Sequence, residues 1–199
     1  RSFPSFKKFL KFFDGKACTI EDFISFFREE SKQFILWYDQ SGTPELKIQE
    51  KFINGNYSIE FEQTKPKSFK NDFKFPQIPI KYKLFDKNGK PITDEKLFIL
   101  YTKNDIIRFR KFKQKPVLSV LRSFSAPVKL NYNISTRDQK IIIRNDTDLF
   151  NRWEQLQKLL FKNLEAYMYG EQIDDEVFLI ISELLFDENI SDEFKALII

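Results

Sequence analysis

Residues 45–62 read ELKIQEKFINGNYSIEFE, and this stretch decides the central fold. Apolar and polar residues alternate on both sides of Asn54-Gly55-Asn56, a sequence typical of a tight hairpin turn. The alternating apolar positions are Leu46, Ile48, Tyr57, Ile59 and Phe61. Because successive side chains of a strand point to opposite faces, this spacing predicts two antiparallel strands that share one buried face.

The same alternation continues beyond the hairpin, after a loop rich in Lys and Pro. We predict further strands over residues 80–84, 96–102, 106–112, 117–124 and 128–134. About seven short strands separated by turn residues are typical of an antiparallel Ig-like β-sandwich. The centre of the chain is therefore predicted to be such a sandwich.

Helical periodicity precedes the sandwich. A first helix is rich in Phe, and Thr19 with Asp22 has the spacing of a capping box at the start of a second helix. Ser31 offers a further cap. The apolar face after that cap contains Phe34, Trp37 and Tyr38.

Helical periodicity also follows the sandwich. An apolar stripe predicts a long helix that ends at Gly170. Its members are Phe150, Trp153, Leu160, Leu164 and Tyr167. Asp174 and Asp175 begin another helix, and Ser191 caps a third. The sequence thus predicts a mixed, multi-segment fold: N-terminal helices, a central antiparallel Ig-like β-sandwich and C-terminal α-helices.

Composition excludes several enzyme classes. The 199 residues include no His and only one Cys, Cys18, so the chain lacks a zinc-peptidase motif, a Ser-His-Asp triad and an internal disulfide. The net charge is +4, but residues 171–199 hold nine acids and one Lys, which leaves a basic body with an acidic end. The lone Cys indicates a reducing compartment, and the lack of a long apolar run predicts no membrane partner. We expect a cytoplasmic location.

Two clusters of charge invite a functional interpretation. Basic residues interleave with aromatic ones over residues 108–115, as in nucleic-acid binders, but a half-buried strand explains the pattern better because Arg108 and Arg110 would face away from Ile107 and Phe109. The acids at residues 174–176 are favoured at a helix start by the helix dipole, which is preferred to a metal site. A stand-alone Ig-like interaction module and a basic nucleic-acid-binding module remain alternatives. The residues themselves identify no active site.

Four stretches, in order, carry a resemblance to a known family. They are DGKACTIEDF at residues 14–23, WYDQSGTP at 37–44, LRSFSAPVKL at 121–130 and NDTDLFNRWE at 145–154. With this order and spacing, the chain resembles the M1 family of zinc metallopeptidases, specifically its aminopeptidase N type in the bacterial alanyl aminopeptidase branch. The resemblance spans nearly the whole chain.

The resemblance implies a division into three parts. Residues 1–43 would be the last helices of a thermolysin-like catalytic domain, residues 44–135 the Ig-like domain, and residues 136–199 the first helices of a C-terminal α-helical domain. The chain would then be an internal fragment, with the remaining domains of the parent aminopeptidase as its partners and Trp37, Tyr38, Phe124 and Trp153 as candidates for packing at domain junctions.

The resemblance also implies what this chain lacks. The parent would be a hydrolase that removes N-terminal residues from peptides with zinc-activated water, and its zinc ligands would lie N-terminal to this part. The chain would supply no catalytic, cofactor-binding or metal-binding residue. It is therefore expected to be inactive alone and to meet peptide substrate only through the parent.

Overall fold

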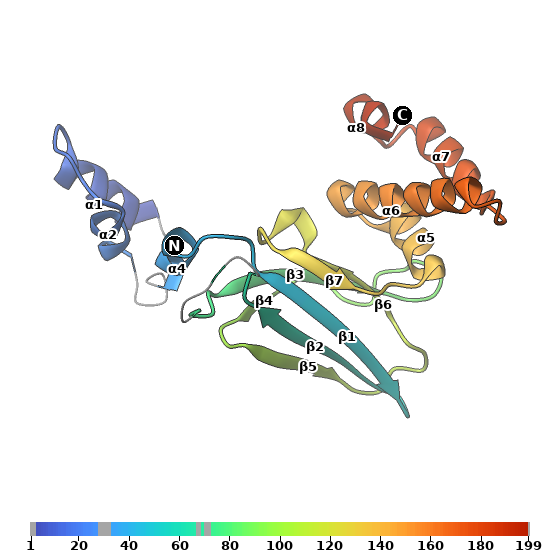
Figure 1. Cartoon of the computed structure of the whole chain (residues 1–199), viewed down its shortest axis with the longest axis horizontal. Helices are drawn as coiled ribbons and strands as arrows, with labels where there is room; N and C mark the ends of the chain where they lie inside the picture. Colours follow the sequence, from blue (N-terminus) through green and yellow to red (C-terminus); the bar gives the residue numbers. More distant parts are fainter. Residues whose placement is uncertain (1–2, 28–32, 67–68, 70–72, 199) are drawn as a thin grey trace.

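The computed structural model describes residues 3–27, 33–66, 69 and 73–198. Its helices are α1 Phe3–Phe13, α2 Ile20–Ser25, α4 Leu36–Asp39, α5 Thr136–Asn145, α6 Leu149–Met168, α7 Glu176–Phe186 and α8 Asp192–Ile198, with 3₁₀ turns η1 Gln33–Ile35 and η2 Arg122–Phe124. Its strands are β1 Glu45–Ile53, β2 Asn56–Thr64, β3 Ile78–Phe85, β4 Lys96–Leu100, β5 Asn104–Phe109, β6 Val117–Val120 and β7 Lys129–Tyr132. Figure 1 shows the α1–α2 pair at one end, the strands in the middle and α5–α8 at the other end. The predicted mixed fold is confirmed.

Two sheets form the sandwich, with strand orders β5-β2-β1-β7 and β4-β3-β6. The predicted hairpin is present: Ile53 pairs with Asn56 across a turn whose two residues, Asn54 and Gly55, have φ of 49° and 76°. Both central residues of a type I′ turn need a positive φ, which Asn and Gly tolerate best. The alternating apolar residues of β1 and β2 are buried against the second sheet; they are Leu46, Ile48, Tyr57, Ile59 and Phe61.

Two details of the sheets differ from the expectation. β7 pairs with β1 in parallel, while the other pairs are antiparallel. The strand predicted over residues 117–124 ends at Val120, so the prediction was wrong for residues 121–124. Leu121, Ser123 and Phe124 all have φ between 49° and 56°, which turns the chain out of the sheet.

The N-terminal helices pack their aromatic rings against each other. The Phe9 ring lies edge-on to Phe23 at 4.9 Å and to Phe26 at 5.7 Å between centroids. The predicted capping box is confirmed, since the Thr19 amide donates to Asp22 Oδ2 at 2.9 Å and the Asp22 amide donates to Thr19 Oγ1 at 3.2 Å. The predicted cap Ser31 lies outside the described residues.

Helices α5–α8 share a second apolar core, centred on Ile143, Leu156 and Val177. Only part of the predicted apolar stripe of α6 is buried. Trp153 and Leu160 pack against this core, but Leu164 and Tyr167 are exposed. The buried face of α6 includes four polar residues: Asn151, Arg152, Gln155 and Asn163. A search for apolar residues at helical spacing therefore does not identify this face correctly. Within the described ranges, no helix is both long and apolar enough to cross a bilayer.

Candidate functional site at the junction of sandwich and helices

Arg122 occupies the turn that ends β6, between the sandwich and α6. Its side chain is only 4% exposed, although the residue carries a full charge. The backbone around it is strained, because Leu121, Ser123 and Phe124 all adopt left-handed conformations without being Gly. Such a conformation persists only where the surroundings determine it, so the turn depends on its hydrogen-bond partners.

Four side chains accept hydrogen bonds from the Arg122 guanidinium. Nη1 donates to Asp146 Oδ1 and, at 3.4 Å, to Ser119 Oγ; Nη2 donates to Thr147 Oγ1 at 3.0 Å, and Nε donates to Glu95 Oε2 at 2.9 Å. The Ser119 hydroxyl donates to the second Asp146 oxygen at 2.5 Å. Arg122 therefore links β6 and the β3–β4 connection to the segment between α5 and α6.

Asp148 secures the strained turn from the helical side. Its Oδ1 accepts a hydrogen bond from the Asn151 amide at 2.9 Å, which caps the start of α6. Its Oδ2 accepts two hydrogen bonds from Ser123, one from the backbone amide at 2.7 Å and one from the hydroxyl at 3.0 Å. One carboxylate thus fixes both the helix start and the left-handed turn.

The carboxylates of Glu95 and Asp146 each lie beside a group of opposite charge. The hydrogen bond from Arg122, together with the Lys81 ammonium 3.3 Å away, holds the pKa of the Glu95 carboxyl below its usual range. The side chain of Asp146 is fully buried, so its negative charge has no solvent to stabilise it and depends on the buried cation. The junction is specified by charge as well as by shape.

A second polar cluster joins the sandwich to α5. The buried Glu50 carboxylate accepts hydrogen bonds from the Tyr57 hydroxyl at 2.5 Å, the Tyr132 hydroxyl at 2.6 Å and Lys115 Nζ at 3.0 Å. Lys115 also lies 3.5 Å from Asp138 of α5. Burial first, and the Glu50 charge second, raise the pKa of Tyr57 and of Tyr132 far above the usual value for tyrosine.

The four predicted junction candidates have different surroundings. Trp37 donates its indole N–H to the Gln77 carbonyl at 3.0 Å and packs against the sandwich core, whereas Tyr38 is exposed. Phe124 and Trp153 belong to one aromatic row, in which Phe150 lies between them at 5.5 and 6.0 Å from their ring centroids. Phe124 is exposed and Trp153 half-buried. Contact of any of the four with a further domain stays a prediction.

The two residues at the centre of the junction, Arg122 and Asp146, were not among the predicted site residues. Arg122 and Asp146 lie within the two stretches at 121–130 and 145–154, but hydrophobic periodicity gives no information about a buried ion pair. One signal was available: Arg122 directly follows the mostly apolar residues 117–121, where a charge must either leave the core or find a partner.

The other charged residues considered as candidates are either exposed to solvent or paired with a group of opposite charge. Arg108 and Arg110 are exposed while Ile107 and Phe109 pack against the core, as predicted for a half-buried strand. The acids at residues 174 and 176 bind Lys140, at 2.6 and 2.5 Å. In the part of the chain that the structure describes, no three His, Cys, Asp or Glu side chains are placed to hold a metal ion, and Cys18 is exposed.

Comparison with known proteins gives consistent matches. Residues 42–133 match the model "Domain of unknown function (DUF3458) Ig-like fold", and residues 136–199 match "Domain of unknown function (DUF3458_C) ARM repeats". Curated relatives include the aminopeptidase N of Caulobacter vibrioides, 32% identical over 98% of this chain, and those of Haemophilus influenzae, 30% over 86%, and Escherichia coli, 27% over 94%.

A solved structure extends this similarity to three dimensions. The Legionella pneumophila aminopeptidase A, crystallised in complex with aspartic acid, superposes with a TM-score of 0.85 at 29% identity and covers 98% of this chain. The chain spans only 22–24% of the length of these proteins.

Proposed function

The chain belongs to the M1 aminopeptidase family as an internal segment, and we propose that it supplies the architecture that holds the other domains of an aminopeptidase in place. The observation that carries the proposal is the buried Arg122–Asp146 pair, which joins the sandwich to the helices. A buried pair of this kind tolerates little change in geometry, because misalignment leaves a charge without its partner in a low dielectric. The sandwich would therefore act as a spacer of fixed orientation.

The three parts of the chain would belong to three domains. Residues 1–43 would complete a catalytic domain, residues 44–135 would form the spacer, and residues 136–199 would begin a helical domain. The α1–α2 pair supports this division, since its Phe rings pack against one another while Phe6 and Phe12 remain exposed. The exposed apolar residues of α6 and α7, including Phe161 and Phe186, would pack against helices outside this chain.

The activity would belong to the whole enzyme, which would remove N-terminal residues from peptides with zinc as cofactor. The donor set of this chain does not fit that metal: His is absent from the sequence, and the described residues bring no three potential ligands together. The zinc would therefore be held by residues of the parent outside this segment. The single exposed Cys18 fits a reducing compartment, and we place the parent in the cytoplasm.

A chimeric enzyme tests the proposal. The segment of the Caulobacter aminopeptidase N that matches residues 1–199 is replaced by this chain, and the purified chimera is assayed for zinc content and for hydrolysis of an alanyl amide. We expect hydrolysis by the chimera and none by the isolated chain with added zinc. A chimera that folds and retains zinc but hydrolyses nothing would contradict the proposal, as would zinc-dependent hydrolysis by the isolated chain.

Two variants of the chimera separate the role of the junction from general damage. Arg122→Met removes the buried cation, and we expect it to reduce kcat/KM in the chimera while the zinc content stays the same. Lys87→Gln removes a cation from an exposed turn and serves as the matched control. If both variants hydrolyse the amide as well as the unchanged chimera, the junction does not position the domains.

A further inference from the structure

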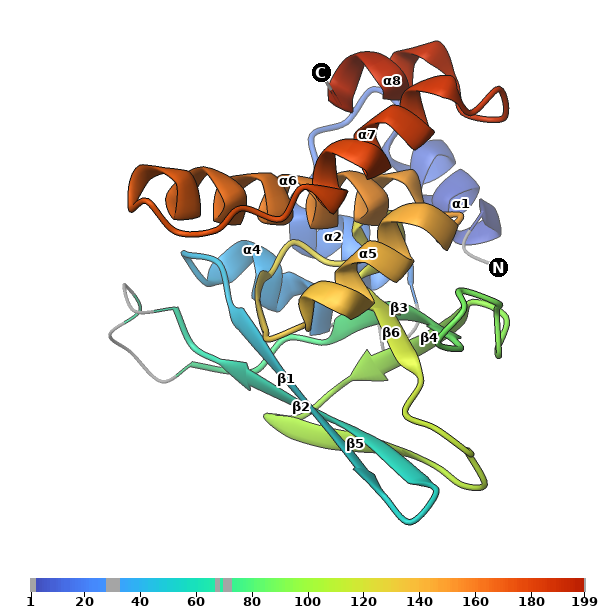
Figure 2. The ribbon, with the colours of Figure 1, turned by 90° about the vertical axis from the view of Figure 1, so that its right-hand side faces the viewer.

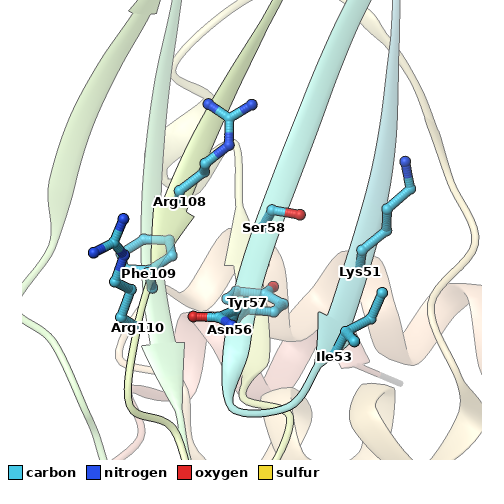
Figure 3. Close-up of a pocket in the computed structure, with 8 residues that line it drawn as sticks. All are labelled: Lys51, Ile53, Asn56, Tyr57, Ser58, Arg108, Phe109 and Arg110. Atoms are coloured by element: carbon cyan, nitrogen blue, oxygen red, sulfur yellow. The ribbon is translucent and has the colours of Figure 1, made fainter.

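Basic side chains gather on the outer face of the sandwich, near the tip of the β1–β2 hairpin. Strand register places Lys51 of β1, Ser58 of β2 and Arg108 of β5 in one row across three strands. Arg110 follows at the end of β5, and all four residues line one pocket, drawn in Figure 3. Phe109, between the two arginines, packs on Tyr57 at 5.8 Å and thereby orients both arginines outward.

The cations of this pocket differ in whether an acidic side chain is paired with them. Lys51 is paired with Glu60 at 2.7 Å, so its charge is already matched by an acid. Directly opposite Arg108 stands Ser58, which carries no charge. Among the described residues, neither Arg108 nor Arg110 has a hydrogen bond or ion pair from its side chain. Two guanidinium groups, each with a fork of donors suited to carboxylates, are therefore available.

The position of β5 lets its backbone contribute to binding as well. The order β5-β2-β1-β7 makes β5 the edge of its sheet, so one side of its backbone has no strand partner within the described residues. An extended peptide can add to such an edge as a further strand. Residues two apart on a strand lie on the same face, about 6.8 Å from each other. Acids at alternate positions of an added strand would thus repeat at the spacing of Arg108 and Arg110.

We propose that the β5 edge and its two arginines form a docking surface for an acidic polypeptide segment in extended conformation. The charge of the surface and the spacing of the arginines select acids at alternate positions, while the edge selects extended backbone. The acidic end of the same molecule is not the occupant, because Figures 1 and 2 both place α7 and α8 on the opposite side of the sandwich from β5.

Fluorescence anisotropy with a labelled peptide tests this proposal. The probe is an eight-residue peptide in which Glu and Val alternate, and the comparison peptide has the same composition with its four Glu contiguous. We expect the alternating peptide to bind the full chain more tightly than the contiguous one, and its binding to weaken as salt is raised. Equal binding of the two peptides would overturn the proposed strand addition.

Charge variants identify the surface. Arg108→Gln with Arg110→Gln is expected to weaken binding of the alternating peptide about tenfold, since two charge-assisted contacts are lost. The control, Lys87→Gln with Lys90→Gln, removes the same charge from an exposed turn elsewhere and should leave binding unchanged. Thermal melting of both variants verifies that each is folded. Equal weakening by both pairs, tighter retention of duplex DNA than of the peptide, or self-association blocked by the Arg108 and Arg110 changes would each overturn the proposal.

Discussion

Replacement of Arg122 by Met isolates the energetic role of the junction. Met keeps the length of the side chain but removes the charge, and among the described residues the fully buried Asp146 carboxylate then retains the Ser119 hydroxyl and the Asp148 backbone amide as donors. Loss of one partner of a buried ion pair costs about 3 to 5 kcal/mol. The lost bond to Glu95 adds at most about 1 kcal/mol, because that carboxylate is 37% exposed.

Urea unfolding followed by far-ultraviolet circular dichroism measures this cost. We expect the free energy of unfolding to fall by about 3 to 5 kcal/mol and the melting temperature by about 6 to 20 °C. Lys81→Met is the matched control, since Lys81 pairs with the same Glu95 at 3.3 Å from a partly exposed position. It should change the unfolding free energy by less than about 1 kcal/mol.

A double variant shows whether the cost comes from the unpaired carboxylate. Asp146→Asn in the Arg122→Met background removes the buried negative charge, and we expect it to recover about 2 kcal/mol relative to Arg122→Met alone. The reasoning is refuted if Arg122→Met costs less than about 1 kcal/mol, or if the two substitutions have additive effects.

Three further predictions concern other parts of the fold. Tyr57 and Tyr132 have raised pKa values when folded but lose their protons near pH 10 when unfolded, so their contribution to stability should be constant below about pH 10 and fall above it by about 1.4 kcal/mol per tyrosine per pH unit; Tyr57→Phe should lessen this slope in urea titrations. Gly89→Ala should lower the melting temperature, because φ is +84° and the new Cβ would lie 2.2 Å from the Asn145 side chain; prior Asn145→Ala should recover part of the loss but not all of it. Thr19→Ala should speed amide hydrogen exchange at the start of α2 without changing exchange in the sandwich, since a lost cap frays only its own helix.

Local patterns were sufficient for the β1–β2 hairpin and for the start of α2. Alternation identified the buried face of β1 and β2, and the Asn54-Gly55 turn fixed their register, because a slip of one residue would expose every apolar side chain of the face. The capping box of Thr19 likewise depends on residues three apart in the sequence. Such features need no knowledge of distant parts of the chain.

The junction depends on residues that are distant in sequence. Arg122 meets Asp146 across 24 positions, and the bend that brings them together consists of three left-handed residues that are not Gly. Strand propensity over residues 117–124 gave no sign of this bend, because the strain is offset by hydrogen bonds that Ser123 donates to Asp148 and that exist only after the helices dock. The same docking places polar residues on the buried face of α6.

The fixed orientation of sandwich and helices is tested most directly by a distance measurement. With Cys18→Ser as background, spin labels at Ile53→Cys on the hairpin tip and Phe161→Cys on α6 occupy exposed positions of the two parts. Pulsed electron spin resonance should give one narrow distance distribution for this protein and a broad one after Arg122→Met. A distribution that is already broad with Arg122 present, or one that stays equally narrow without it, would contradict the account of the junction.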